Sequence, residues 1–128
     1  MDWIVLVTIA VLLQYLFISL LVGRARATYG IKAPATTGHD VFERYYRVQM
    51  NTVELMVVLI PSLWLAAAYW SPEWMCGLGV IYIAGRFVYL KTYINPQAKR
   101  TLGYALSYIP TFLLLLAALL GALISLAS

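Results

Sequence analysis

The stretch FERYYRVQMNTVEL, residues 42–55, is followed after Met56 by the apolar stretch VVLIPSLWLAAAYW, residues 57–70. Charged and amide side chains crowd the first stretch, whereas the second contains no charged residue. A helix of about 20 apolar residues spans the roughly 30 Å of hydrocarbon in a bilayer. The two stretches together therefore predict a membrane-spanning helix whose first turns are polar.

The composition places the whole chain in a membrane. Of the 128 residues, 63% are hydrophobic and only 11% are charged, which is more apolar surface than a small soluble domain can bury. Long continuous apolar runs favour helices over the alternating strands of a membrane barrel. We therefore predict an all-α integral membrane protein, with residues 1–128 forming a single four-helix transmembrane domain. The expected spans are Trp3–Gly23, Tyr46–Trp70, Trp74–Tyr93 and Gly103–Ala127.

The nine basic residues are distributed unevenly between the loops. Most lie in or beside the first and third loops, whereas the second loop, Ser71–Glu73, has none. The first and third loops of an up-and-down bundle share a side, and the positive-inside rule makes that side cytoplasmic. The net charge of +4 thus reports topology, and no nucleic-acid partner is indicated. The expected location is a bacterial inner membrane or the endoplasmic reticulum.

Residues 27–41 are expected to form an irregular loop, because Pro34, Gly38 and two threonines lie within KAPATTGHD. Asp40 is a plausible N-cap for the helix that follows.

Helical spacing gives the polar residues of the second span a direction. Arg47, Asn51 and Glu54 follow at i, i+4 and i+7 and share one face, whereas Gln49 points nearly opposite. Glu54 lies about 10 Å deeper than Arg47, where a bare carboxylate is costly. The stripe predicts either an internal ion-pair network that fixes helix packing or a polar pocket open to the cytoplasm.

A second polar stripe follows on the third span and ends on the same side as the first. Aromatic residues near helix ends usually form an interfacial belt, and that interpretation is adopted for Trp3, Trp70, Trp74 and Tyr104. It is not adopted for Tyr89 and Tyr93, because they share a face with an arginine. The two stripes together predict a site for an anionic ligand with several polar arms. The second stripe comprises Tyr82, Arg86, Tyr89 and Tyr93, with Lys99 and Arg100 in the loop beyond.

Other kinds of site find little support in the sequence. His39 is the single histidine, so no metal-ligand spacing exists and no metal cofactor is expected. The single cysteine, Cys76, lies in an apolar run and is interpreted as a small buried residue.

Four segments together carry a family resemblance: FERYYRVQMNTVE, SLWLA, CGLGVIYIAGRFVY and KTYINPQAKR. Their combination resembles the MAPEG family, the membrane-associated proteins of eicosanoid and glutathione metabolism, and most of all its microsomal glutathione transferases and leukotriene C synthases. The likeness covers about Gly23 to Arg100. It implies a homotrimer of four-helix subunits that binds glutathione between neighbouring subunits near the cytosolic face.

The resemblance also assigns roles to residues. Arg100 matches the catalytic arginine that stabilises the glutathione thiolate. Arg26 and Gln49 match residues that reach glutathione from the neighbouring subunit. The residues that match glutathione contacts within one subunit are Arg47, Asn51, Glu54, Tyr89 and Tyr93.

The implied activity is a membrane-bound glutathione transferase that attacks a lipophilic electrophile, or a peroxidase that reduces a lipid hydroperoxide. Leukotriene C synthase has a second arginine where this chain has Ala27, and the absence of that arginine argues against leukotriene synthesis. The same relative has a tyrosine where this chain has Leu55, which implies one ligand contact fewer. Two alternatives stay open. One is a non-catalytic lipid-binding scaffold like the lipoxygenase-activating branch of the family. The presence of Arg100 argues against it, because a scaffold does not need to activate a thiol. The other is an ion path through the buried charges.

Overall fold

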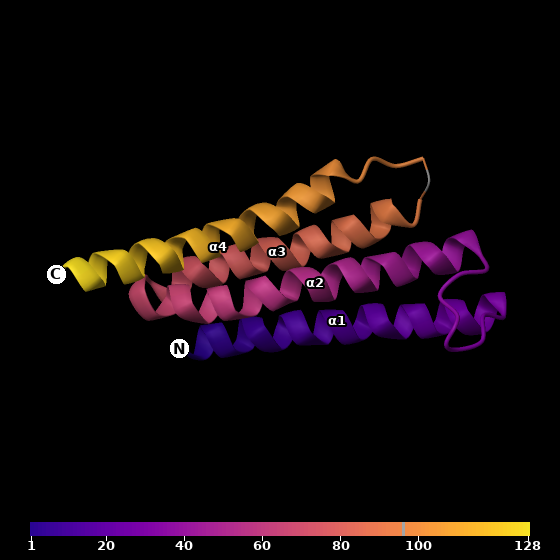
Figure 1. Cartoon of the computed structure of the whole chain (residues 1–128), viewed down its shortest axis with the longest axis horizontal. Coiled ribbons are helices and arrows are strands. Elements are labelled where there is room, and N and C mark those ends of the chain that lie inside the picture. Colours follow the sequence, from indigo (N-terminus) through magenta and orange to yellow (C-terminus); the bar gives the residue numbers. More distant parts are fainter. Residues whose placement is uncertain (96) are drawn as a thin grey trace.

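The structure is a computed structural model that describes residues 1–95 and 97–128. It contains four helices, α1 (Asp2–Tyr29), α2 (Asp40–Tyr69), α3 (Pro72–Tyr93) and α4 (Thr101–Ala127) (Figure 1). No strand occurs among the described residues. The prediction of an all-α chain with four helices is therefore confirmed.

Three of the helices, α1, α2 and α4, are long and apolar enough to cross a membrane. The remaining helix, α3, has 22 residues and is thus about 33 Å long, which matches the bilayer in length. It carries Arg86 and Lys91 and is not one of the three apolar helices. That α3 also crosses the membrane stays a prediction.

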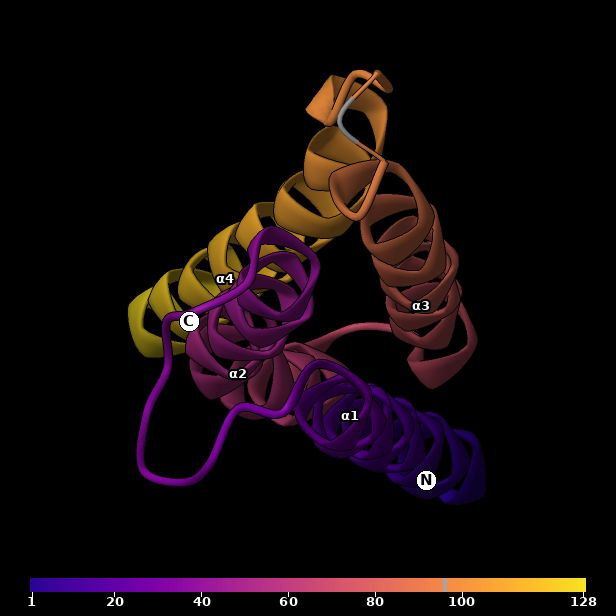
Figure 2. The ribbon, with the colours of Figure 1, turned by 90° about the vertical axis from the view of Figure 1, so that its right-hand side faces the viewer.

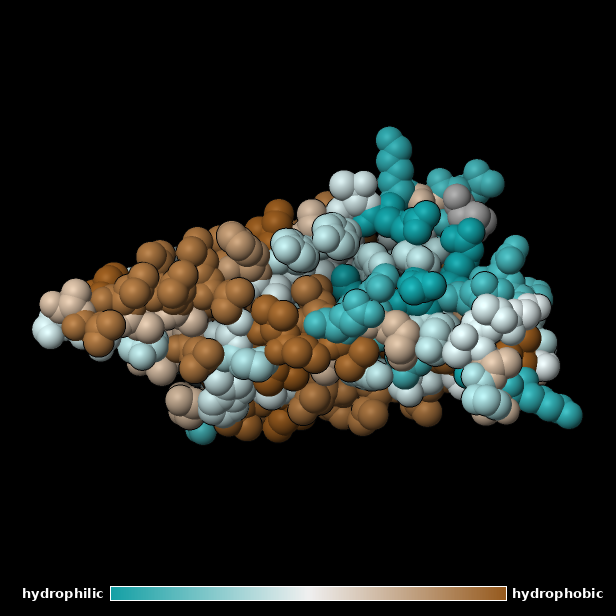
Figure 3. All heavy atoms as spheres, viewed as in Figure 1, coloured by the Kyte–Doolittle hydropathy of each residue, from teal (hydrophilic) through white to brown (hydrophobic). Residues whose placement is uncertain are grey.

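The two long loops lie at one end of the bundle. Figure 1 shows the α1–α2 and α3–α4 connections together at that end, with both termini and the α2–α3 turn at the other. Hydrophilic residues gather at the loop end and extend along the bundle toward its middle, whereas hydrophobic residues cover most of the rest of this face (Figure 3). The prediction that the first and third loops share a side is confirmed.

The helices α2 and α3 form the centre of the bundle. They pack against each other, and each also packs against α1 and α4. Seen from the loop end, α1 and α4 lie on opposite sides (Figure 2). The largest buried cluster includes Leu59 and Leu63 of α2, Val11 of α1, Tyr82 of α3 and Leu114 of α4.

Two glycines let α3 and α4 approach closely near the loop end. A Cβ atom on Gly103 would lie 2.5 Å from the Cα atom of Tyr89. A Cβ atom on Gly85 would lie 2.6 Å from the backbone carbonyl carbon of Leu106. These neighbours are backbone atoms that cannot rotate away, so glycine at both positions is a condition of the α3–α4 contact.

The ends of the first loop differ from the sequence interpretation. Helix α1 continues through Arg24 and Arg26 to Tyr29, and Gly30 ends it in the left-handed conformation at φ 68°. Helix α2 is capped by His39, whose Nδ1 atom accepts a hydrogen bond from the Val41 backbone N–H at 3.2 Å. The prediction of Asp40 as the N-cap is wrong, because Asp40 is already the first helical residue. The irregular loop therefore spans residues 30–39 only.

Candidate functional site

A polar groove runs along α2, α3 and α4 from the loop end toward the middle of the bundle. It consists of three adjoining hollows of about 300, 430 and 270 Å³, which we call the outer, middle and inner hollows. Tyr93 and Arg100 line both the outer and the middle hollow. Asn51, Tyr89 and Tyr104 line both the middle and the inner hollow. The shared walls make the three hollows one continuous groove.

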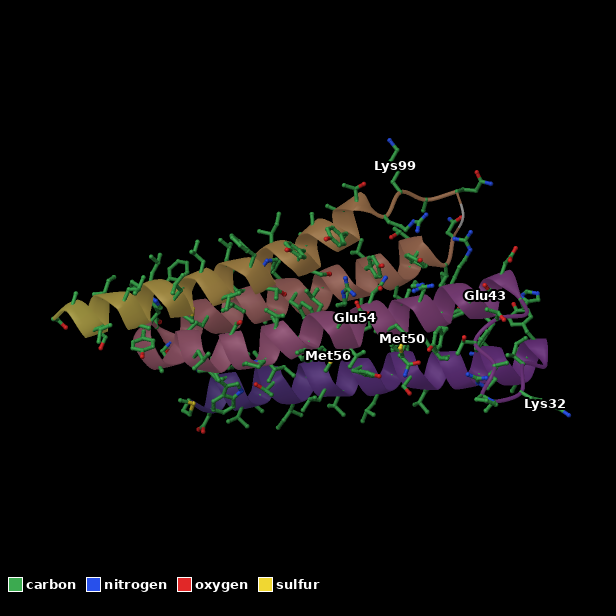
Figure 4. All side chains as sticks on the ribbon, viewed as in Figure 1. Lys32, Glu43, Met50, Glu54, Met56 and Lys99 are labelled. Carbon is green, nitrogen blue, oxygen red and sulfur yellow. The ribbon has the colours of Figure 1, made fainter. Side chains whose placement is uncertain are left out.

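The groove collects six of the eight site residues that the sequence predicts. Helix α2 contributes an exposed arginine near the loops and, deeper, a partly buried asparagine and an exposed glutamate. Figure 4 shows Glu54 about midway along α2 and Glu43 near its loop end. The six residues are Arg47, Asn51, Glu54, Tyr89, Tyr93 and Arg100.

The groove is held together at its middle by a contact between α2 and α3. The Asn51 Nδ2 atom donates a hydrogen bond to the Tyr89 hydroxyl at 2.6 Å. The rings of Tyr89 and Tyr93 lie 5.3 Å apart, so each supports the position of the other. The amide oxygen of Asn51 is a hydrogen-bond acceptor on the same side chain.

Arg100 lies at the boundary of the outer and middle hollows, just before α4. Its guanidinium lies 4.7 Å from the centroid of the Tyr93 ring, a cation–π contact that holds the charge at the groove. Arg44 fixes the same region, because its Nη1 atom donates a hydrogen bond to the Tyr93 backbone oxygen at 3.1 Å. The groove thus presents a positioned cation where α3 ends and α4 begins.

Arg86 forms the buried floor of the inner hollow. It is only 2% exposed, and its guanidinium lies 4.1 Å from the Tyr89 ring centroid. Its Nε atom donates to the Ser107 hydroxyl at 3.0 Å, and its Nη1 atom donates to the Thr52 hydroxyl at 3.2 Å. One side chain therefore ties α3 to both α2 and α4. Arg86 therefore stabilises the packing of the helices, whereas the exposed residues of the α2 stripe, Arg47 and Glu54, line the open groove.

Two predicted residues lie away from the groove, at the side of the bundle that α1 occupies. They are Gln49 of α2 and Arg26 of α1. The Gln49 Nε2 atom donates a hydrogen bond to the Tyr15 hydroxyl of α1 at 3.3 Å. The Arg26 Nη1 atom donates to the Ala35 backbone oxygen at 2.7 Å. The prediction that Gln49 points away from the Arg47 stripe is confirmed. The structure does not bring Gln49 and Arg26 together with the other six residues.

The groove also contains residues to which the sequence interpretation gave no role in a site. Tyr104, assigned to an interfacial belt, lines the middle and inner hollows, and Tyr108 lines the inner one. A signal for them was present, since Arg100, Tyr104 and Tyr108 recur every four residues and so share one side of α4. Asp40 and Glu43 line the outer hollow and add negative charge to it.

Among the described residues, the groove holds neither a cluster of metal ligands nor a thiol. Within residues 1–95 and 97–128, no three side chains of His, Cys, Asp or Glu come together as a metal site would require. The Cys76 thiol is buried, as expected, and lies outside the groove.

Comparisons with known proteins identify the family of the chain. The MAPEG family matches residues 4–120. The chain is 41% identical over 121 residues to an uncharacterized protein of Synechocystis sp., covering 94% of this chain and 88% of that protein. It is 40% identical over 110 residues to microsomal glutathione S-transferase 2 of Homo sapiens, covering 86% and 73%. It is 36% identical over 115 residues to leukotriene C4 synthase of Cavia porcellus, covering 90% and 76%. The chain is therefore a membrane protein of the MAPEG family.

Proposed function

We propose that this chain is a membrane-bound glutathione transferase that holds glutathione in the polar groove and activates its thiol beside Arg100. The observation that carries the proposal is the gathering of six side chains along one groove from α2, α3 and the loop before α4, namely Arg47, Asn51, Glu54, Tyr89, Tyr93 and Arg100. The relatives named microsomal glutathione S-transferase 2 and leukotriene C4 synthase support the same activity.

The charges of the groove complement those of glutathione, which carries two carboxylates, one ammonium group and one thiol. Arginine forms charge-assisted hydrogen bonds with carboxylates, and Arg47 in the outer hollow is the candidate partner. Glu54 in the inner hollow is the candidate partner of the ammonium group. Asn51 and the two tyrosine hydroxyls supply neutral hydrogen bonds between these ends.

Arg100 supplies the activation step. A free thiol has a pKa of about 8.5 and is mostly protonated at neutral pH, whereas the thiolate is the nucleophile. A guanidinium beside the sulfur favours the thiolate, and each unit by which the pKa falls corresponds to about 1.4 kcal/mol. The thiolate then forms a bond to an electrophilic carbon while the leaving group departs with its electron pair.

The same thiolate supports peroxide reduction. Two glutathione molecules and one lipid hydroperoxide give glutathione disulfide, the lipid alcohol and water. In both reactions the bilayer is the reservoir of the hydrophobic substrate, and two of the helices that carry the groove, α2 and α4, are long and apolar enough to cross that bilayer.

Gln49 and Arg26 require a second subunit in this proposal. Both lie on the α1 side, away from the groove of their own chain. In a homotrimer that side of one subunit faces the groove of the next, so both residues would contact glutathione bound there. The basic loop end then faces the cytoplasm, whether the membrane is a bacterial inner membrane or the endoplasmic reticulum.

A thiolate titration tests the proposal. Purified protein in detergent is mixed with glutathione, and thiolate absorbance in the ultraviolet is followed against pH. The expected thiol pKa lies about one unit or more below the free value of about 8.5. Binding with an unshifted pKa would favour the lipid-binding scaffold instead. No binding of glutathione would overturn the proposed function and direct attention to the ion path through the buried charges.

A further inference from the structure

Tyr104 and Tyr108 form a stacked pair of rings on α4. Their centroids lie 5.4 Å apart and their planes are 15° from parallel. Tyr104 is 52% exposed and Tyr108 is 46% exposed, so the other helices of the same chain do not cover the pair. Offset-stacked rings with open surface offer a flat wall to a further aromatic ring.

The pair lies next to the position proposed for the thiolate. Tyr104 lines the middle hollow together with Arg100, and both tyrosines line the inner hollow. Steps of four residues place Arg100, Tyr104 and Tyr108 along one side of α4, about 6 Å apart along the axis. Moving away from the loops, the groove therefore leads from a cation to two aromatic rings.

The path that a hydrophobic substrate would take from the membrane interior also leads to the Tyr104–Tyr108 pair. Beyond Tyr108, α4 exposes Ile109, Phe112 and Leu113. Across the inner hollow, α2 presents the apolar side chain of Leu55. A hydrophobic molecule that moves along α4 from the bilayer core reaches Tyr108 and Tyr104 before Arg100.

We propose that the Tyr104–Tyr108 pair binds the second substrate and selects planar aromatic electrophiles over linear aliphatic ones. The inference rests on the proposed function, because it needs a glutathione thiolate beside Arg100. The sulfur forms a bond to the ring carbon that bears the leaving group. The carbon–chlorine bond of an aryl chloride then breaks, and chloride departs with the electron pair, so no further reactant is needed.

Rate measurements on the full chain in detergent test the selection. With saturating glutathione, kcat/KM is measured for the aromatic 1-chloro-2,4-dinitrobenzene and for the linear aldehyde trans-2-nonenal. Tyr104→Leu and Tyr108→Leu are each expected to lower the ratio of aromatic to aliphatic kcat/KM by about tenfold, which corresponds to the loss of one aromatic stacking contact.

Two further variants separate the rings from other causes. Tyr104→Phe keeps the ring without the hydroxyl and is expected to restore the ratio. Phe87→Leu removes an exposed ring from α3, outside the three hollows and away from the α4 route, and is expected to leave the ratio at the wild-type value. A ratio unchanged in both tyrosine-to-leucine variants overturns the inference. Loss of the assembled oligomer with an unchanged ratio also overturns it, since the pair is then a contact between copies.

An inhibition measurement on the wild-type protein tests the inference even if the variants fail to fold. Nitrobenzene and nitrocyclohexane share a nitro group on a six-membered ring, but only nitrobenzene is planar. Competitive inhibition by nitrobenzene against the aryl chloride, and not by nitrocyclohexane, supports the flat wall, whereas equal inhibition overturns it. A protein that never lowers the thiol pKa overturns the proposed function and this inference together. If the protein lowers the thiol pKa and conjugates both electrophiles, but replacing Tyr104 or Tyr108 leaves the ratio unchanged, only the inference is overturned.

Discussion

Arg100 is the residue on which thiol activation depends, and its surroundings make it testable alone. Its guanidinium is positioned by the Tyr93 ring and does not form part of the buried core. Replacing it therefore changes the charge of the groove without opening a cavity. Its neighbour Lys99 is also basic and exposed, but projects away from the bundle (Figure 4).

Arg100→Ala is expected to return the pKa of bound glutathione to near its free value of about 8.5. Below that pH the thiolate fraction falls tenfold per unit, so turnover at pH 7 is expected to drop about tenfold or more. The pH–rate profile should shift to higher pH while the Kd for glutathione changes by less. Lys99→Ala serves as the control and should keep the wild-type profile. Equal rates for Arg100→Ala and wild type would exclude the proposed role.

Glu54→Gln tests the binding end of the groove. The change keeps the size of the side chain but removes the charge proposed to meet the ammonium group. We expect the Kd for glutathione to rise about tenfold, which is about 1.4 kcal/mol, measured by isothermal calorimetry in detergent. Glu73→Gln, at the opposite end of the bundle, is the matched control. An unchanged Kd in the Glu54 variant would contradict the assignment of the inner hollow.

At the scale of the helices, the groove depends on how closely α4 approaches α3. Gly103 and Gly85 permit that approach, and Arg86 ties both α2 and α4 to α3 through two hydroxyl groups. Gly103 faces the backbone of Tyr89, the residue that also accepts the Asn51 hydrogen bond. Packing at this point therefore sets the geometry of the binding residues.

Gly103→Ala is expected to push α4 away from Tyr89, since the added Cβ would lie 2.5 Å from a backbone atom. Overpacking of this kind costs about 1–3 kcal/mol, so Tm should fall and the Kd for glutathione should rise. Gly77→Ala is the matched control, because a Cβ at Gly77 meets no atom within 4 Å. A Gly103 variant with the thermal stability and Kd of wild type would show that α4 has room to accept the methyl group.

At the scale of the whole molecule, the eight predicted site residues fall on two separate sides. Six line the polar groove, whereas Gln49 and Arg26 contact α1 and the first loop. A one-chain site would leave the last two without a role in binding. A site shared between subunits gives every one of them a role.

Mixed oligomers test the shared site. Gln49→Ala and Arg47→Ala are each expected to lose most activity when made alone. Co-expressed with two different affinity tags and purified through both, they should regain part of the wild-type rate, because some grooves then receive both intact residues. A mixture no more active than either parent would favour a site within one chain. Cross-linking followed by mass measurement of the wild-type protein would give the number of subunits directly.

Much of this architecture follows from the sequence alone, because helical periodicity is local. The apolar runs predict the helices, and the spacing of Arg47, Asn51 and Glu54 places them on one face with Gln49 opposite. The up-and-down order of four spans predicts that the first and third loops share an end. The errors in the bounds of the helices lie at their termini, where residues 27–29 prove helical and His39 replaces Asp40 as the N-cap. Such ends depend on a few weak local interactions.

Only the tertiary structure decides what each polar side chain touches, since its neighbours come from helices distant in the chain. Arg86 and Tyr89 share a stripe, yet Arg86 is sealed by Thr52 and Ser107 whereas Tyr89 meets Asn51 at the groove. Tyr104 resembles an interfacial tyrosine in the sequence and becomes a groove wall because Gly103 brings α4 against α3. Periodicity determines the direction in which a side chain points, but helix packing determines whether that direction leads to a core, a groove or a neighbouring subunit.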